Sequence, residues 1–237
     1  MVRQNYLNIK ILINMHWNDE GYLLSKNNFG ENSIIMEVFT LNHGKCAGIV
    51  YGGSSRKNKK IFQIGNKILI NCKSKNENEI GYFSIELIKP VSPIFFDDKK
   101  RSICILSASS ILKILLPERQ LNRKIYNSFE NLLNKLCYDN WIKLYIFWEL
   151  SLVKELGFEI NLSDKKKSIN FANYTVAVND KVFKIPRLLS EPNDMKVSKN
   201  EIKEALIFNK SLFMENFIFP NKIKFPLSRN ILEKYFN

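Results

Sequence analysis

The sequence predicts an α+β protein in which a small five-stranded β-barrel precedes a larger helical domain. Two observations carry this prediction: short apolar runs separated by turn residues up to about residue 91, and a change of hydrophobic period from two to about three and a half after residue 98. The 237 residues, 45% of them hydrophobic, are enough for one large or two small folded domains. We therefore expect the barrel at 15–92 and the helical domain at 93–237.

Five apolar runs are expected to form the strands of the barrel. They cover residues 21–24, 33–39, 46–51, 67–72 and 81–88. In the last run Phe83, Ile85 and Leu87 alternate with Tyr82, Ser84 and Glu86. This alternation predicts one face toward the core and one face toward solvent. Residues 42–45 (NHGK) are typical of a hairpin turn. Five strands at this spacing are the number that an OB-fold requires.

Three helices are expected after the barrel, because apolar residues recur with helical spacing within 103–115, 125–136 and 141–156. The third is apolar on several faces, so it should run through the middle of a bundle and end at Gly157. It also contains Glu149, and because an unpaired buried carboxylate is costly, we expect an Arg or Lys to reach it.

Residues 161–197 lose this periodicity and are expected to form an irregular insertion. Within it, 175–178 and 181–183 predict a small hairpin around Asn179 and Asp180. Helical spacing resumes after Ser198, which forms a capping box with Glu201, and a last helix is expected near 228–235.

The formal net charge of +13 favours a polyanionic partner, because neutralising phosphates releases condensed counterions. Nucleic acid is the first choice and an anionic membrane surface the second, although a coding bias toward lysine would add charge without functional demand. No segment has the length of a membrane helix, so the sequence predicts a chain that does not enter a membrane.

Metal and enzyme chemistry find little support in the sequence. The four cysteines, Cys46, Cys72, Cys104 and Cys137, form no C-x-x-C pair, and the two histidines have no metal-ligand spacing. No phosphate-binding G-x-x-x-x-G-K-[ST] loop exists, and no carboxylate cluster indicates a nuclease site. The sequence therefore predicts a protein that is not an enzyme, and a metal-dependent nuclease rests on charge alone.

An ordered set of motifs resembles the RecO family of DNA repair proteins. In the first half these are residues 17–25 (WNDEGYLLS), 29–33 (FGENS), 43–45 (HGK) and 52–57 (GGSSRK). In the second half they are 116–119 (LPER), Tyr126, 148–150 (WEL) and 155–158 (ELGF). No single motif is diagnostic, but together they run in order from about Met15 toward the end of the chain.

The resemblance implies an N-terminal OB-fold, a C-terminal helical domain and a recombination mediator without catalytic chemistry. RecO-like proteins bind single- and double-stranded DNA, anneal complementary strands, bind the acidic C-terminal tail of single-strand-binding protein (SSB), and act with RecR to load RecA. The resemblance thus implies a cytoplasmic, nucleoid-associated bacterial protein. The alternative is an adaptor that docks SSB or RecR without direct work on DNA.

The chain departs from the family in two places. Many members carry a four-cysteine zinc ribbon where this chain has residues 163–185 without a cysteine, so we expect no zinc and a hairpin held by packing alone. Residues 1–14 precede the position where the family usually begins. They are either an extension translated from an upstream start codon, which we favour, or a genuine arm.

The best candidate for DNA contact is the segment 52–60, expected as a loop, in which glycines let phosphates approach while Arg56, Lys57, Lys59 and Lys60 supply charge. A solvated loop of lysines is the alternative. Tyr51 precedes the loop and could stack on a base, although half-buried packing is also common for such an aromatic. Three further lysines, Lys45, Lys67 and Lys73, would extend the surface if their side chains share the outer face of the barrel.

An SSB tail requires an apolar pocket beside a cation that takes the terminal carboxylate. The helical domain offers Arg119, Arg123 and Lys124 beside Tyr126 and Phe129. We place the pocket there as a hypothesis, with ordinary helix-surface charges as the alternative.

Overall fold

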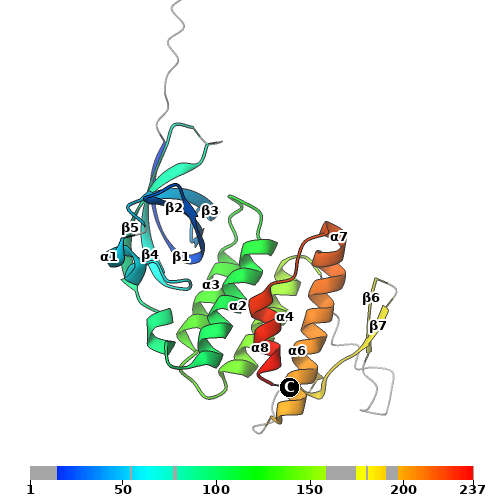
Figure 1. The fold of residues 1–237 in the computed structure, drawn as a ribbon. Coiled ribbons are helices and arrows are strands. Elements are labelled where there is room, and N and C mark those ends of the chain that lie inside the picture. The colour runs from blue at the N-terminus through cyan, green and yellow to red at the C-terminus, as the bar shows by residue number, and fades with distance from the viewer. Residues whose placement is uncertain are drawn as a thin grey trace, which may run out of the picture.

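The computed structural model describes residues 15–53, 55–76, 79–158, 175–179, 181–190 and 197–236. It confirms the α+β class: a barrel in the first third of the chain lies against a bundle of helices (Figure 1). The barrel strands are β1 (Met15–Phe29), β2 (Ser33–Thr40), β3 (Gly44–Tyr51), β4 (Lys67–Ser74) and β5 (Gly81–Lys89). All five expected apolar runs lie within these strands.

The strand order β1-β2-β3-β5-β4 closes into a barrel because β1 pairs with both β2 and β4. Four of the five strand pairs are antiparallel. The closing pair, β3 with β5, is parallel and joins only Gly48 to Gly81 and Ile49 to Tyr82. The barrel is therefore most weakly closed between β3 and β5.

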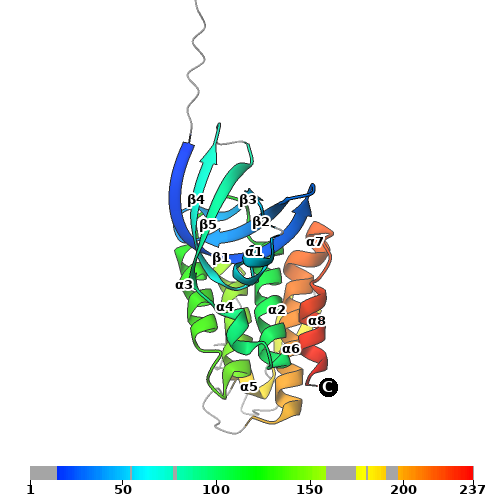
Figure 2. The ribbon, with the colours of Figure 1, turned by 60° about the vertical axis from the view of Figure 1, so that its left-hand side comes forward.

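The first two strands serve two cores at once, because successive side chains of a strand point to opposite faces. Leu23 and Val38 belong to the barrel core, whereas their neighbours Tyr22, Leu24 and Phe39 belong to the core of the helical domain. The barrel and the bundle thus share buried surface and do not meet through a loose linker (Figure 2).

The helical domain is built mainly from five helices. These are α2 (Lys99–Leu115), α3 (Arg123–Asn134), α4 (Trp141–Glu155), α6 (Lys199–Phe213) and α8 (Leu227–Lys234). A 3-10 turn (Ser92–Phe95) leads into α2, and a π-helical turn (Met214–Ile218) with α7 (Phe219–Asn221) follows α6. The expected helices and the capping box at Ser198 are confirmed, and no described helix is long and apolar enough to cross a membrane.

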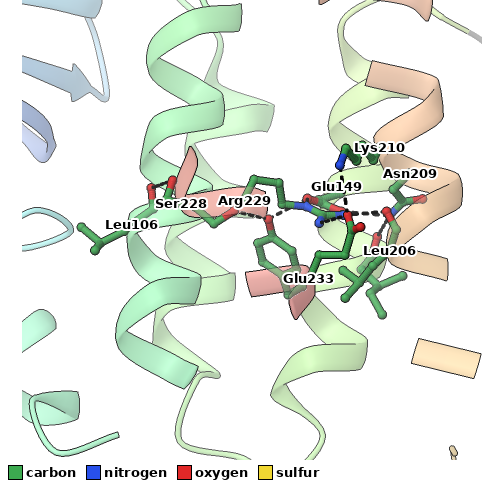
Figure 3. Close-up of polar contacts among 11 residues, drawn as sticks. Leu106, Glu149, Leu206, Asn209, Lys210, Ser228, Arg229 and Glu233 are labelled. Atoms are coloured by element: carbon green, nitrogen blue, oxygen red, sulfur yellow. Dashed lines mark hydrogen bonds and ion pairs between the residues drawn. The ribbon is translucent and has the colours of Figure 1, made fainter. Parts of the chain in front are cut away.

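The buried carboxylate of Glu149 has a basic partner, as predicted from the sequence. Arg229, which is fully buried on α8, donates from Nη2 to Glu149 Oε2 at 3.1 Å and to the carbonyl of Leu206 at 2.7 Å (Figure 3). Tyr145 and Asn209 also donate to the Glu149 carboxylate. Burial alone would lower the pKa of Arg229, but Glu149 more than offsets it, and the net pKa is raised. The network ties α4, α6 and α8 together.

The expected hairpin is confirmed as β6 (Thr175–Val178) and β7 (Lys181–Lys184). It is not held by packing alone: Asn179 Nδ2 donates to the carbonyl of Glu215 at 2.9 Å, and Lys181 pairs with the Glu215 carboxylate at 2.6 Å. A short helix, α5 (Arg187–Ser190), follows it. The remaining parts of the insertion, at 161–174 and 191–196, and the stretch 1–14 lie outside the described residues.

Candidate nucleic-acid interface

The cationic segment after β3 is a short helix, α1 (Arg56–Ile61), and the prediction of a loop there is wrong. Ser55 caps the helix by accepting from the Asn58 amide, and Asn58 Nδ2 donates to the carbonyl of Gly52 at 2.8 Å. Gly52 has a φ of +65°, which glycine adopts without strain. Local hydrogen bonding, which Ser and Asn favour, thus converts the expected loop into a turn of helix.

The helix α1 follows β3 in the chain, and its sequence contains four cationic residues. Lys60 is exposed, whereas the side chains of Arg56, Lys57 and Lys59 lie outside the described part of the structure. The segment from Gly52 to Ile61 contains no acidic residue, so its formal charge is +4.

Two exposed tyrosines form an aromatic pair on the outside of the barrel. The rings of Tyr51 and Tyr82 stack with centroids 5.2 Å apart and an interplanar angle of 13°. Tyr51 is 67% exposed and Tyr82 45% exposed, and a hydrogen bond between their hydroxyl groups raises the pKa of Tyr51. Exposed, mutually ordered aromatic faces are what base stacking requires. Sequence reasoning selected Tyr51 but missed Tyr82, although the alternation in β5 placed it on the wet face.

Lys73 completes this outer face. Lys73 of β4 lies directly opposite Tyr82 of β5 in the strand register, so the two side chains project from the same face of the sheet, and that of Lys73 is exposed. Ile68, Ile70 and Cys72, which alternate with the lysine face of β4, are buried inside the barrel. The prediction for Leu87 of β5 is wrong: it was expected in the core, but its side chain is 39% exposed. Leu87 pairs with Ile68, next to the point where the register of β4 and β5 shifts between Lys67 and Ile68.

Lys67 shares the face of Lys73 but does not lie on an open surface. Its Nζ is 2.8 Å from Glu20 Oε1 and 2.8 Å from Oε1 of Glu130 on α3. Burial works to lower the pKa of Lys67, but hydrogen bonds from Lys67 to Glu130 and Glu20 outweigh it and raise the pKa. The expected extension of the DNA surface to Lys67 is thus corrected, because carboxylates of β1 and α3 neutralise its charge.

Lys45 is likewise turned toward the helical domain. Its Nζ donates to the carbonyl of Lys113 on α2 at 2.8 Å, and burial lowers its pKa. Its backbone carbonyl accepts from the amide of Arg119 at 2.8 Å. The placement of Lys45 on an outer DNA surface is corrected too: it joins the two domains.

The apolar part of the hypothetical SSB-tail pocket is buried. Tyr126 is 1% exposed and Phe129 0% exposed, and both pack on Tyr22 of the barrel with centroids 5.6 and 5.3 Å away. They occur three positions apart on the inner face of α3, so both serve the shared core. They cannot line an open pocket, and this placement is corrected.

The three cations of that hypothesis do not converge. Arg123 donates to Asn42 Oδ1 at 2.8 Å, and Lys124 is exposed with Nζ 3.8 Å from Glu155. Arg119 lies at a hollow at the mouth of the barrel, where its Nη2 donates to the carbonyl of Glu79 at 3.2 Å. Its backbone has a φ of +57°, in the left-handed region that non-glycine residues rarely adopt.

The hollow has a volume of about 660 Å³, and His43, one of its lining residues, is paired with the buried Asp19. Nδ1 of His43 is 2.8 Å from Oδ2 of Asp19, and the His43 ring stacks on Trp17 at 4.2 Å. Asp19 also accepts from the amide and side chain of Asn42. Burial alone would raise the pKa of Asp19, but these hydrogen bonds prevail and lower it.

Two parts of the chain match models of known protein families. Residues 15–91 match the family described as "Recombination protein O N terminal", and residues 97–208 match "Recombination protein O C terminal". A protein of Wolbachia sp. subsp. Drosophila simulans (strain wRi) named "DNA repair protein RecO" is 29% identical over 244 residues, covering 92% of this chain and 99% of the relative.

Two more relatives carry the same name. The protein of Wolbachia pipientis subsp. Culex pipiens (strain wPip) is 34% identical over 151 residues, which cover 63% of this chain and 62% of the relative. The protein of Cereibacter sphaeroides (strain ATCC 17025 / ATH 2.4.3) is 33% identical over 150 residues, with coverages of 63% and 62%. The match therefore spans less than two thirds of these two relatives and nearly all of the wRi protein.

Proposed function

This chain belongs to the RecO family and so has a role in DNA repair and recombination, and on that premise we propose that it is a recombination mediator. It binds single- and double-stranded DNA, anneals complementary strands coated with SSB, and helps to load RecA together with RecR. The net charge of +13 and the OB-type strand order support this proposal.

The observation that carries the proposal is the outer face formed by Tyr51, Tyr82 and Lys73, which the chain continues from Tyr51 into the cationic helix α1. Aromatic faces accept bases of any sequence, and cations follow the phosphates of either strand. We name this set, Tyr51, Tyr82, Lys73 and the α1 cations, the outer barrel surface.

Annealing on this surface requires no covalent bond to be made or broken. Cationic side chains of the protein reduce the electrostatic repulsion between two DNA strands, and holding both strands on one protein raises their local concentration. The proposal therefore assigns no catalytic residue and no nucleotide hydrolysis to this chain.

The proposal includes no metal. The segment 163–185 contains neither cysteine nor histidine, so its residues do not fit a zinc ribbon. In the part of the chain that the structure describes, no group of three or more His, Cys, Asp or Glu residues could hold a metal ion. Metal analysis of the purified protein should find no stoichiometric zinc; one zinc per chain would contradict the proposal.

For the SSB tail we propose a new position, the apolar hollow of about 550 Å³ that lies between α1, the 3-10 turn and α2. Its wall includes Pro93, Phe96 and Leu106, and Phe96 is exposed. Lys60 also lines the hollow and is exposed, so a cation accompanies the apolar wall, as an acidic tail with an apolar end requires. Binding of an SSB-tail peptide should weaken in Phe96→Ala and remain in the matched surface variant Phe219→Ala.

One observation favours the second candidate, an adaptor that docks SSB or RecR without direct DNA work. Lys45 and Lys67 are engaged by the helical domain, which leaves fewer cations of the barrel open to phosphates. The two functions differ in whether the outer barrel surface binds DNA at all.

Salt dependence of DNA binding distinguishes them. In a variant with Arg56, Lys57, Lys59 and Lys60 replaced by Gln, the slope of log affinity against log salt should flatten by about 0.7 for each single-strand phosphate that the variant no longer neutralises. The control replaces four exposed lysines of the helical domain, Lys99, Lys154, Lys222 and Lys224, and removes the same formal charge. Equal slopes in both variants and the wild type would favour the adaptor.

A further inference from the structure

The hollow at the barrel mouth is distinct from the outer barrel surface and has the features of a small-ligand site. Its volume of about 660 Å³ lies within the range of about 300–1,000 Å³ that is typical of such sites. The floor includes the aromatic rings of Trp17 and Phe83 and the thiols of Cys46 and Cys72. The rim includes Arg119, His43 and Glu79, so an apolar floor faces a polar rim that carries one guanidinium and one carboxylate.

The aromatic part of the hollow is ordered before any ligand enters. Trp17 is stacked on His43 at an interplanar angle of 16° and meets the edge of Phe83 at 5.9 Å. Because the pKa of Asp19 is lowered, its buried carboxylate is ionised at neutral pH and must accept the hydrogen bond, which His43 donates from Nδ1–H. This contact fixes the plane of the imidazole, whose side chain is 36% exposed at the rim.

Arg119 is the group of the rim that can bind an anion, because its guanidinium alone supplies the donors. Arg119 uses one Nη2 contact for the carbonyl of Glu79, and a guanidinium has five N–H donors, so donors remain for an incoming phosphate. Burial raises the pKa of Cys72, and the guanidinium of Arg119 partly offsets this, which indicates that its positive charge acts at the floor. The left-handed backbone of Arg119, held by the hydrogen bond that its N–H donates to the Lys45 carbonyl, keeps this side chain at the rim.

We propose that this hollow binds one unpaired nucleotide of a DNA strand, with the base against the His43 and Trp17 rings and its phosphate at Arg119. The inference rests on the proposed DNA-binding function and adds a second site that recognises a base outside a stack. A duplex cannot present such a base, whereas a frayed or overhanging end can. The hollow would then distinguish strand ends and unpaired positions from continuous duplex.

Trp17 supplies the readout, because the other two tryptophans, Trp141 and Trp148, are buried in the helical core. The full-length protein, isotopically labelled at the tryptophan indoles, is titrated with three hairpin duplexes: one with a single-nucleotide 5′-phosphorylated overhang, one with an abasic overhang, and one blunt. Thymidine monophosphate is titrated separately to tell a free nucleotide from a strand end. We expect the Trp17 indole resonance to shift with the nucleotide overhang and not with the abasic or blunt duplex.

Two variants test the residues. His43→Gln keeps an amide donor for Asp19 but removes the ring, and Arg119→Gln removes the charge; each should weaken binding of the overhang at least fivefold. Tyr138→Ala, at an exposed tyrosine of the helical domain, is the matched control and should leave the affinity unchanged. Unfolding curves establish that each variant folds.

The outcomes separate this inference from the proposed function. If a 30-nucleotide single strand binds but the overhang leaves Trp17 unshifted, the hollow is not a nucleotide site and the DNA-binding function stands. If neither binds, both fail. A Trp17 shift with N-acetylphenylalanine and none with any nucleotide would also overturn the inference, because the hollow would then take a peptide carboxylate.

Discussion

Tyr51 and Tyr82 stack across the weakest seam of the barrel, at 5.2 Å between ring centroids, where β3 and β5 share only two residue pairs. The pair is exposed and pre-ordered, so a base that stacks on it incurs little of the side-chain ordering cost that binding usually requires. This arrangement is why we assign single-strand contact to the outer barrel surface.

Replacing Tyr51 and Tyr82 by Ala should weaken single-strand binding by about 1–3 kcal/mol for each base that can no longer stack. Double-strand binding should change less, because paired bases do not expose their faces. Fluorescence anisotropy with labelled strands measures both. Tyr138→Ala is the control, and an unchanged single-strand affinity in the double variant would remove the stacking role.

Gly44→Ala should destabilise the protein more than Gly30→Ala. Both glycines have positive φ, at +69° and +65°, so both substitutions incur backbone strain of about 1–2 kcal/mol. A Cβ at Gly44 would also lie 2.2 Å from the carbonyl oxygen of Gln120, whereas one at Gly30 meets nothing within 4 Å. Urea unfolding gives the difference, and equal free energies of unfolding would mean that the close contact between barrel and helical domain is not tight.

Arg229→Met should lower the free energy of unfolding by about 3–5 kcal/mol, because Glu149 would remain buried without its cation. Combining it with Glu149→Gln should recover part of this stability, since a neutral amide is less costly to bury than a carboxylate. Chemical denaturation of the wild type, the single variants and the double variant checks this. A double variant that is as unstable as the sum of the single ones would show that the two residues act independently.

Asp19→Asn should reduce stability at pH 7 by about 1–3 kcal/mol, because the carboxylate accepts several hydrogen bonds. The folded pKa of Asp19 lies below its ordinary value of 3.8, so its contribution is present above that pH and is lost as the pH falls through the lowered folded pKa. The difference between wild type and variant should therefore shrink as unfolding is measured from pH 7 down to acid. A difference that is constant with pH would contradict the assignment.

Sequence periodicity predicted most of the fold because each strand and long helix carries a local pattern. The alternation in β4 and the apolar faces of α3 and α4 are properties of neighbouring residues, and so is the capping box of Ser198. The helix α1 was missed because six residues contain too little periodicity, and its cap depends on Ser55 and Asn58.

The candidate site was predicted less well because its residues are sorted by contacts between distant segments. Lys67 and Lys73 have the same parity on β4, yet Glu130, 63 positions away from Lys67, neutralises only Lys67. Tyr126 and Phe129 are buried because Tyr22 of the barrel packs on them. The need of Glu149 for a basic partner could be predicted, but the choice of Arg229 could not.

The most direct test of the mediator function is annealing of complementary oligonucleotides coated with cognate SSB, with and without this protein, at low and moderate salt. Full-length SSB is compared with SSB that lacks its acidic tail. Two variants are measured beside the wild type: one with Arg56, Lys57 and Lys59 replaced by Gln, which keeps Lys60 because that residue also lines the hollow proposed for the tail, and a control with Lys99, Lys154 and Lys222 replaced by Gln. The account predicts fast annealing that depends on the tail and is abolished when these α1 cations are replaced. Tail-dependent binding to SSB without any annealing would contradict it and leave the adaptor.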